Sequence, residues 1–120
     1  MAESFRGLKI WQISEDLVIE IYRLTKKFPG DEVFSLTNQL RRAAISVPAN
    51  IAESSGRWGE KDKIQFLMIA RGSITEIRSH ISIAKRLHYI NDSEYTKIDS
   101  SYEQLTKSLN AFIRTIRPTN

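Results

Sequence analysis

The sequence predicts an all-α protein, an antiparallel up-down-up-down four-helix bundle that forms one domain over residues 1–120. Three observations predict it. Apolar residues recur at spacings of three and four in four successive segments, which is the pattern of amphipathic helices. Glycine and proline are scarce and stand mostly between these segments. No segment alternates steadily between apolar and polar residues as a strand does, and short connections place consecutive helices antiparallel.

The first two helices are predicted on either side of the Pro29-Gly30 pair. Before it, the apolar residues at helical spacing are Leu8, Trp11, Leu17, Ile21, Leu24 and Phe28. After it, they are Leu36, Leu40, Ala43, Val47 and Ile51. Asp31 and Glu32 precede the second run, where negative charge meets the positive end of the helix dipole. We therefore expect these carboxylates to cap a helix rather than to catalyse proton transfer.

Two longer helices are predicted after the connection between Gly56 and Gly59. The third runs from about Glu60 to His88 with Ile64, Leu67, Ala70, Ile74, Ile77, Ile81 and Ala84 on its apolar face. The fourth carries Tyr95, Ile98, Tyr102, Leu105, Leu109, Phe112 and Ile116. It opens at Asn91-Asp92-Ser93, where Asp92 or Ser93 is expected as the N-cap. Gly72, inside the third helix, costs about 1 kcal/mol relative to alanine and permits a close approach of another helix.

Pro48 stands inside the second helix before its apolar spacing has ended. A proline there costs about 3 kcal/mol, because it removes one backbone hydrogen bond and collides with the carbonyl of Ala44. We expect Pro48 to bend the helix, and we expect Ser46, Asn50 or a neighbouring chain to satisfy that carbonyl.

A polar row follows the same helix between its apolar positions and can face water, an adjoining subunit or a ligand. Its members are Gln39, Arg42, Ser46, Asn50 and Glu53. Together with Glu76 they are the candidate subunit interface, and a kink that serves only the internal core is the alternative. For Arg42, a salt bridge to Glu53 or Glu76 is the favoured interpretation, because a guanidinium holds a carboxylate through two parallel hydrogen bonds.

The composition excludes several classes of site. There is no cysteine, which excludes a disulfide framework, an iron-sulfur cluster and thiolate zinc sites. The two histidines, His80 and His88, lie roughly 12 Å apart along one helix, too far to share one metal ion. No metal and no cofactor are therefore expected. The sequence shows no leader and no run of eighteen apolar residues, so we expect a cytoplasmic protein without a membrane partner.

No residue set indicates catalysis. The serines of Ser54-Ser55-Gly56 and Ser100-Ser101 have no nucleophile-elbow context, and neither a phosphate-binding glycine-rich loop nor an HExxH pattern is present. We expect a protein that is not an enzyme and has no small-molecule substrate.

A net charge of +4 with a pI near 9.5 is compatible with nucleic acid but also with ordinary solubility. The charge is uneven, since no acidic residue follows Glu103. Trp11 has the spacing of a packing residue, whereas Trp58 lies in a glycine-flanked polar connection and is either structural or functional. The candidate nucleic-acid-binding residues are Arg41, Arg57, Lys61, Lys63, Arg114 and Arg117.

Four stretches of the chain carry a resemblance to a known family. They are the KIWQ opening, IYRLTKKFP, QLRRAAISVPANIAES and FLMIARGSITE. The sequence resembles the four-helix-bundle 23S rRNA-intervening sequence proteins over residues 5 to about 90, and the fourth helix fits only by pattern. One departure is Ser54-Ser55, where such proteins commonly have Glu-Gly.

The resemblance implies a non-enzymatic bundle that assembles as a ring-like homopentamer, with members encoded inside intervening sequences of large-subunit ribosomal RNA genes. The fold is also similar to that of accessory proteins of diversity-generating retroelements, which are basic pentamers that bind nucleic acid and a reverse transcriptase. Two functions follow as hypotheses. One is a homo-oligomer that binds ribosomal RNA or other nucleic acid, and the other is a structural or protein-interaction adaptor.

Overall fold

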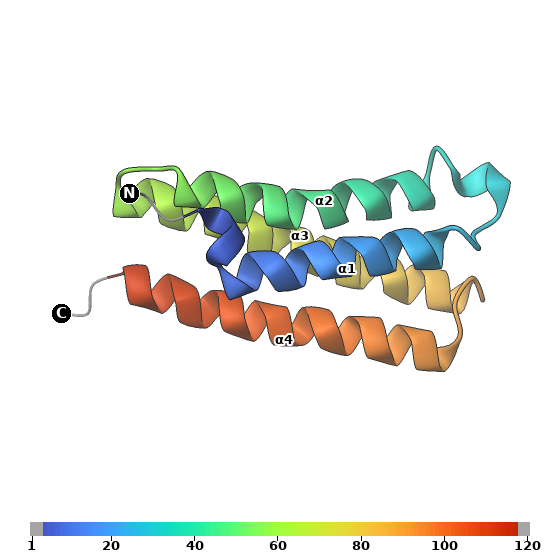
Figure 1. The fold of residues 1–120 in the computed structure, drawn as a ribbon. Coiled ribbons are helices and arrows are strands. Elements are labelled where there is room, and N and C mark those ends of the chain that lie inside the picture. The colour runs from blue at the N-terminus through green and yellow to red at the C-terminus, as the bar shows by residue number, and fades with distance from the viewer. Residues whose placement is uncertain (1–3, 118–120) are drawn as a thin grey trace.

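The computed structural model of the protein describes residues 4–117, and these form four long helices and two short 3-10 helices. The elements are η1 (Phe5–Gly7), α1 (Lys9–Thr25), η2 (Gly30–Glu32), α2 (Leu36–Ser55), α3 (Glu60–Arg86) and α4 (Asp92–Ile116). No strand occurs within residues 4–117, so the all-α prediction is confirmed. Consecutive helices run in opposite directions along the bundle (Figure 1).

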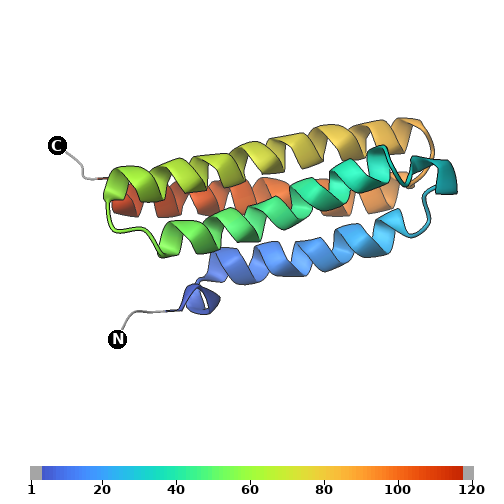
Figure 2. The ribbon, with the colours of Figure 1, turned by 90° about the horizontal axis from the view of Figure 1, so that it is seen from above.

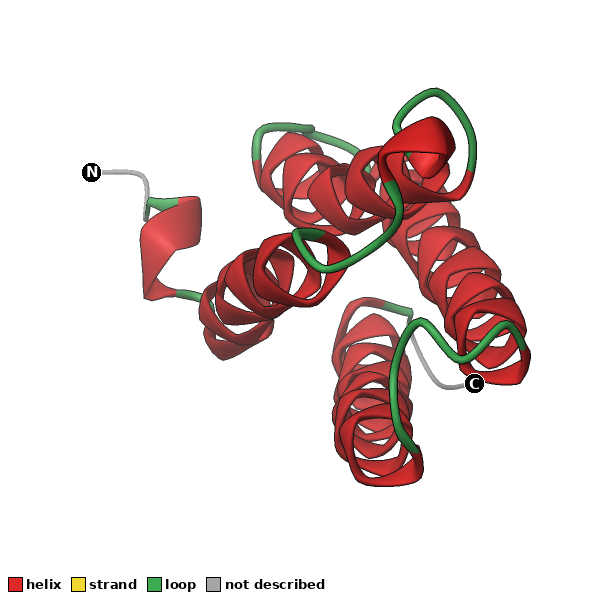
Figure 3. Ribbon diagram, turned by 90° about the vertical axis from the view of Figure 1, so that its right-hand side faces the viewer, coloured by secondary structure: helices red, strands yellow, loops and turns green. Residues whose placement is uncertain are grey.

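The four helices enclose one apolar core in an elongated body of 47 × 24 × 20 Å. Figure 2 shows the helices lying lengthwise beside one another, and Figure 3 shows them end-on. Most core residues come from the predicted apolar spacings, because each helix turns one face inward. The buried apolar residues outside the predicted runs are Ile10, Ala44, Ile90 and Ile113. The largest fully buried apolar side chains are Ile21, Leu40, Val47, Ile51, Leu67, Ile74, Ile77, Ile81, Tyr102, Leu105 and Leu109.

The α1–α2 connection is fixed by Glu32, as the sequence predicts for a carboxylate before α2. One oxygen of Glu32 accepts a hydrogen bond from the backbone N–H of Leu36 at 3.3 Å. The other accepts one from the hydroxyl of Tyr89 at 2.8 Å. Glu32 therefore satisfies a donor at the start of α2 and ties this connection to the chain segment between α3 and α4.

The N-cap of α4 is Asn91, and the prediction of Asp92 or Ser93 is wrong by one or two residues. The side chain of Asn91 accepts from the backbone N–H of Glu94 at 2.7 Å. The carboxylate of Glu94 in turn accepts from the backbone N–H of Asn91 at 2.9 Å. This reciprocal capping box satisfies two donors at once, which neither of the other positions offers because Glu94 would no longer be three residues ahead.

Gly72 is exposed on α3, and no helix of the same chain packs on it within residues 4–117. A Cβ atom built on Gly72 would meet nothing within 4 Å. The core face of α3 is formed instead by Ala70 and Ile74, both of which are buried. Because Gly72 has no side chain, the outer surface of α3 is flat at this position.

Candidate functional site

Most of the predicted subunit-interface residues line one shallow groove on the outside of α2 and α3. We call it the α2/α3 groove, and its volume is about 460 Å³. Gln39, Arg42 and Ser46 enter it from α2, and Glu76 enters it from α3. The other lining residues are Phe34, Asn38, Ala43 and Ser73. Ser73 was not among the predicted site residues, although it stands three residues before Glu76 and so shares its helix face.

Ser46 is the centre of a small hydrogen-bond network at the edge of this groove. Its hydroxyl lies 2.9 Å from that of Ser73, which joins α2 to α3. The amide of Asn50 donates to the backbone carbonyl of Ser46 at 2.8 Å and to its hydroxyl at 3.0 Å. Asn50 is thus held inside its own helix, and its amide is already in use before any second chain approaches.

The expected satisfaction of the Ala44 carbonyl by Ser46 or Asn50 is not what the structure has. Asn50 follows Ser46 by one helical turn and therefore reaches the carbonyl of Ser46, while the carbonyl of Ala44 lies six residues back and out of reach. The helix α2 nevertheless continues through Pro48 to Ser55. The interruption in its hydrogen bonding is thus absorbed within one unbroken helix.

Arg42 is exposed in the groove, and the predicted salt bridge to Glu53 or Glu76 does not form within residues 4–117. Glu53 lies three helical turns from Arg42, about 16 Å along the axis, and binds Arg57 instead at 2.6 Å. Glu76 lies 3.3 Å from Nε2 of His80, one turn along α3. The groove therefore presents the guanidinium of Arg42 to whatever covers it.

Five of the six predicted nucleic-acid-binding residues lie at one end of the bundle, which we call the basic end. The α2–α3 connection and the C-terminal end of α4 meet there (Figures 1 and 2). Arg57 lies in the connection, Lys61 and Lys63 lie at the start of α3, and Arg114 and Arg117 lie at the end of α4. Lys61, Arg114 and Arg117 are exposed to solvent. The antiparallel topology thus gathers cations that are more than fifty residues apart in sequence.

Two of these cations are partly engaged by the protein itself. The guanidinium of Arg57 binds Glu53 and lies 4.5 Å from the centre of the Phe66 ring. The ammonium of Lys63 lies 3.4 Å from the carbonyl of Ser54 and so satisfies the last turn of α2. The charge available to a polyanion therefore comes mainly from the three exposed cations of the basic end.

Arg41, the sixth predicted residue, lies apart from this cluster. Its guanidinium lies 4.5 Å from the centre of the Tyr22 ring, and its Nε donates to the hydroxyl of Thr25 at 2.8 Å. These contacts join the first half of α2 to the end of α1, away from the basic end. Of the two adjacent arginines, it is Arg41 that binds within the protomer and Arg42 that faces solvent.

The two tryptophans have opposite surroundings. Trp11 packs against the core and meets the ring of Phe5 edge to face at 5.0 Å, so its predicted packing role is confirmed. Trp58, in the α2–α3 connection, is 99% exposed. Phe66, a third aromatic of interest, lies beneath Arg57 and is half-buried.

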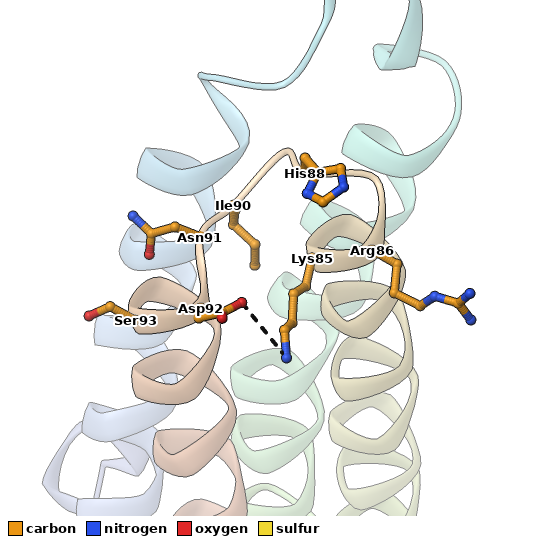
Figure 4. A pocket seen from close by; sticks show the side chains of 7 residues that line it. All are labelled: Lys85, Arg86, His88, Ile90, Asn91, Asp92 and Ser93. Carbon is orange, nitrogen blue, oxygen red and sulfur yellow. Dashed lines mark ion pairs between the residues drawn. The ribbon is translucent and has the colours of Figure 1, made fainter.

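A larger and very open hollow of about 830 Å³ lies at the opposite end, beside the α3–α4 turn (Figure 4). Its charged groups already have partners or face outward. Lys85 reaches toward Asp92, with 3.9 Å between Nζ and Oδ1, while Arg86 points away from the hollow. His88 and Ser93 lie at its rim. The hollow results from the tight α3–α4 turn, and the reactive groups among its lining residues do not converge on one point.

Comparisons with known proteins agree with this architecture. A solved structure of a protein of unknown function from the S23 ribosomal protein family of Bacteroides thetaiotaomicron superposes with a TM-score of 0.80 at 25% sequence identity. The alignment covers 87% of this chain and 97% of that chain. A search of curated proteins found no match. None of the helices in residues 4–117 is long and apolar enough to cross a membrane.

The family comparison covers nearly the whole bundle. The match extends from residue 6 in η1 to residue 111 in α4 and so includes both the α2/α3 groove and the α2–α3 connection. It also includes more of α4 than the sequence motifs alone indicate. The chain belongs to the 23S rRNA-intervening sequence protein family.

Proposed function

We propose that the protein is a non-enzymatic homo-oligomer that binds RNA through its basic end and is associated with 23S rRNA intervening sequences. The observation that carries the proposal is the gathering of Lys61, Arg114 and Arg117, all exposed, where α3 begins and α4 ends. Such cations bind phosphates without reading sequence and release counterions when they do. The pentamer implied by the family resemblance is the assembly we favour.

Oligomerisation matters to this function because one protomer has little net charge. Glu60 and Asp62 stand in the first turn of α3 and offset part of the positive charge at the basic end. The chain as a whole carries +4, and five copies would carry about +20 by formal counting. Several basic ends on one particle would bind one RNA chain together, which raises avidity without any new contact.

The α2/α3 groove is the contact through which we expect the copies to assemble. Arg42 is exposed there without an ion-pair partner within residues 4–117, and the side chain of Phe34 at the same groove is 94% exposed. An aromatic side chain and an arginine are the residue types enriched where interfaces bind most strongly. Glu76 on the opposite wall supplies a carboxylate for a second chain.

RNA binding is tested by filter retention of labelled ribosomal RNA between about 50 and 200 mM salt, the range over which phosphate contacts weaken strongly. The variant Arg114→Ala/Arg117→Ala should bind several-fold more weakly and with a salt slope reduced by about two. The matched control Lys26→Ala/Lys97→Ala also removes two exposed charges, near the other end of the bundle, and should bind like the parent. Absence of retention at low salt and micromolar protein rules out the proposal.

Assembly is tested separately by light scattering. Arg42→Glu should lower the measured mass, because it places a carboxylate opposite Glu76 and whatever group the second chain brings to Arg42. Lys107→Glu, an exposed charge reversal on α4, should leave the mass unchanged. A parent protein that remains a monomer at high concentration contradicts the assembly.

A protein-interaction adaptor is the second candidate. The two most exposed large apolar side chains, Phe34 and Trp58, favour it, since such residues commonly anchor protein partners. A pull-down that recovers the same protein after nuclease treatment would support the adaptor and not the RNA-binding function.

A further inference from the structure

Trp58 is the most exposed large apolar residue of the described chain, at 99%. Its indole packs on no core residue, so it contributes nothing to the stability of the bundle through burial. A fully exposed indole offers its π-face to a ligand, and nucleic-acid bases stack on such faces. The indole is therefore free to contact a ligand, and its surroundings indicate which chemistry such a contact would have.

The connection that carries Trp58 leaves the ring accessible. Gly59 meets open space at its missing Cβ, and a Cβ on Gly56 would meet only the carbonyl of Glu53, at 3.7 Å. The neighbouring guanidinium of Arg57 is turned toward Phe66 and Glu53 and so does not cover the indole. An open hollow of about 440 Å³ adjoins it, lined by Ala52, Glu53, Gly56, Arg57, Trp58, Gly59 and Asp62.

The charges around this hollow separate a base from its phosphates. Glu53 is already paired with Arg57, so the carboxylate of Asp62 is the unpaired negative group that borders the hollow; it repels phosphate but accepts hydrogen bonds from the amino groups of bases. Lys61, Arg114 and Arg117 at the same end attract the backbone instead. A flat, uncharged, π-rich group beside a polyanion fits this arrangement, and an unpaired nucleobase has both properties.

We propose that Trp58 is a stacking platform for an unpaired nucleobase, so that the basic end binds single-stranded nucleic acid in preference to duplex. This inference rests on the proposed RNA-binding function and gives that function its substrate class. In a duplex, the base faces are covered by their neighbours and only the phosphates are offered. A single strand offers both the phosphates and a free base face, as aromatic single-strand binders require.

The test uses the fact that the chain has only two tryptophans. Trp11→Phe keeps an aromatic ring against Phe5 and leaves Trp58 as the single indole. Titration of this variant with single-stranded oligoadenylate should quench the emission of Trp58, and the quenching should saturate together with binding measured by anisotropy of the labelled strand. A duplex of equal length should quench far less. Single-stranded DNA of the same sequence keeps the bases but lacks the 2′-hydroxyl of the ribose. Equal quenching by DNA and RNA would indicate base stacking, and weaker quenching by DNA would indicate recognition of the ribose.

Affinity measurements complete the test. Trp58→Ala should weaken single-strand binding by about 5- to 160-fold, the range given by the loss of one base–aromatic stack, while Trp58→Phe should retain most of the affinity. Ile19→Ala removes another exposed large apolar side chain, on α1 and outside the α2/α3 groove, and should not change affinity. Because Trp58 is outside the core, each variant should unfold at the same temperature as the parent.

Three results would overturn the inference. Equal affinity of Trp58→Ala and the parent, without quenching, would leave RNA binding in place and remove only the stacking role. A lower mass of Trp58→Ala by light scattering would assign the indole to a contact between copies. Absence of any binding by the parent would remove the proposed function and this inference together.

Discussion

The guanidinium of Arg78 in α3 donates two hydrogen bonds to the carboxylate of Asp99 in α4, from Nε to Oδ1 at 2.8 Å and from Nη2 to Oδ2 at 3.1 Å. The side chains are 34% and 21% exposed. The hydrogen bond to Asp99 raises the pKa of Arg78 above its usual value, so the pair stays charged on the arginine side at all ordinary pH values. It joins the second half of α3 to the first half of α4.

We expect this pair to couple by about 1 kcal/mol, because it is two-pronged and partly screened from water. The measurement is a double-mutant cycle of urea unfolding with Arg78→Met, Asp99→Asn and the double variant. The same cycle on Arg23 and Glu20, an exposed pair on α1, should give a coupling well below that value. Equal couplings would show that the bidentate geometry contributes nothing.

The variant Tyr102→Phe is predicted to be more stable than the parent protein. The ring of Tyr102 is fully buried, and its hydroxyl has no hydrogen-bond partner in residues 4–117. An unsatisfied buried hydroxyl costs about 1–3 kcal/mol, so Tyr102→Phe should raise the free energy of unfolding by about 1 kcal/mol. A decrease of that size would mean that a polar partner, such as a buried water molecule, satisfies the hydroxyl.

The pH dependence of the same variant checks the burial. Burial raises the pKa of Tyr102 far above 10.0, its ordinary value. As the pH rises, Tyr102 therefore ionises in the unfolded chain before it does so in the folded chain. Its contribution to the free energy of unfolding is complete below pH 10 and is lost as the pH rises beyond that value. The stability gain from Tyr102→Phe should accordingly be constant near neutral pH and should increase in strongly alkaline solution.

The core was predictable because burial follows from spacing within each helix. Residues such as Ile21, Leu67 and Leu105 lie on the inward face whichever helices are neighbours. The cross-helix pairs were not predictable in this way. Contacts such as Arg78 to Asp99 and Ser46 to Ser73 depend on how far one helix slides along the next, which the connections and the whole core decide together.

The two arginines of α2 show the same limit at the candidate site. Arg41 and Arg42 point about 100° apart, so the sequence indicates that their roles differ. The sequence predicts the pairing within the protomer for Arg42, but the structure has it for Arg41. The apolar run used for α2 includes Ala43, whereas the equally buried Ala44 shows that the inward face extends further around the helix. Arg41 shares the Ala44 side and therefore reaches α1, and Arg42 is left to the groove.

Removal of the α4 cap should destabilise the bundle. Asn91→Ala loses the side-chain acceptor for the Glu94 N–H and should cost about 1 kcal/mol in the free energy of unfolding. Ser93→Ala, an exposed neighbour without a capping hydrogen bond, is the control and should change stability little. Urea unfolding followed by circular dichroism measures both, and equal effects would contradict the assignment of the cap.

Glu94 should make stability depend on pH in acid. The hydrogen bond from Lys27, and then that from the backbone of Asn91, hold the pKa of Glu94 below its ordinary value of 4.5. The contribution of Glu94 to the free energy of unfolding is therefore complete above pH 4.5, and it is lost as the pH falls through the lower pKa of the folded state. Glu94→Gln keeps the capping geometry but not the charge, so the parent and this variant should become equally stable in strong acid. A difference that persists unchanged there would argue against the ion pair.

The variant His88→Gly is predicted to be more stable than the parent protein. His88 has a φ of 64°, in the left-handed region, immediately after the last residue that caps α3. The N–H of Tyr89 donates to the carbonyl of Ala84 at 2.9 Å and the N–H of His88 to that of Lys85 at 2.9 Å, which is the pattern of a helix closed by a Schellman motif.

A side chain at this left-handed position costs about 1–2 kcal/mol, and glycine avoids most of that cost despite its greater freedom in the unfolded chain. His88→Gly should therefore raise the free energy of unfolding by about 1 kcal/mol. Ser82→Gly, on the exposed face inside α3, should lower it by a similar amount, since there the same residue type only weakens a regular helix. Changes of opposite sign in the free energy of unfolding would show that backbone conformation, and not the loss of a side chain, decides the effect. A loss of stability in both variants would contradict the left-handed assignment of His88.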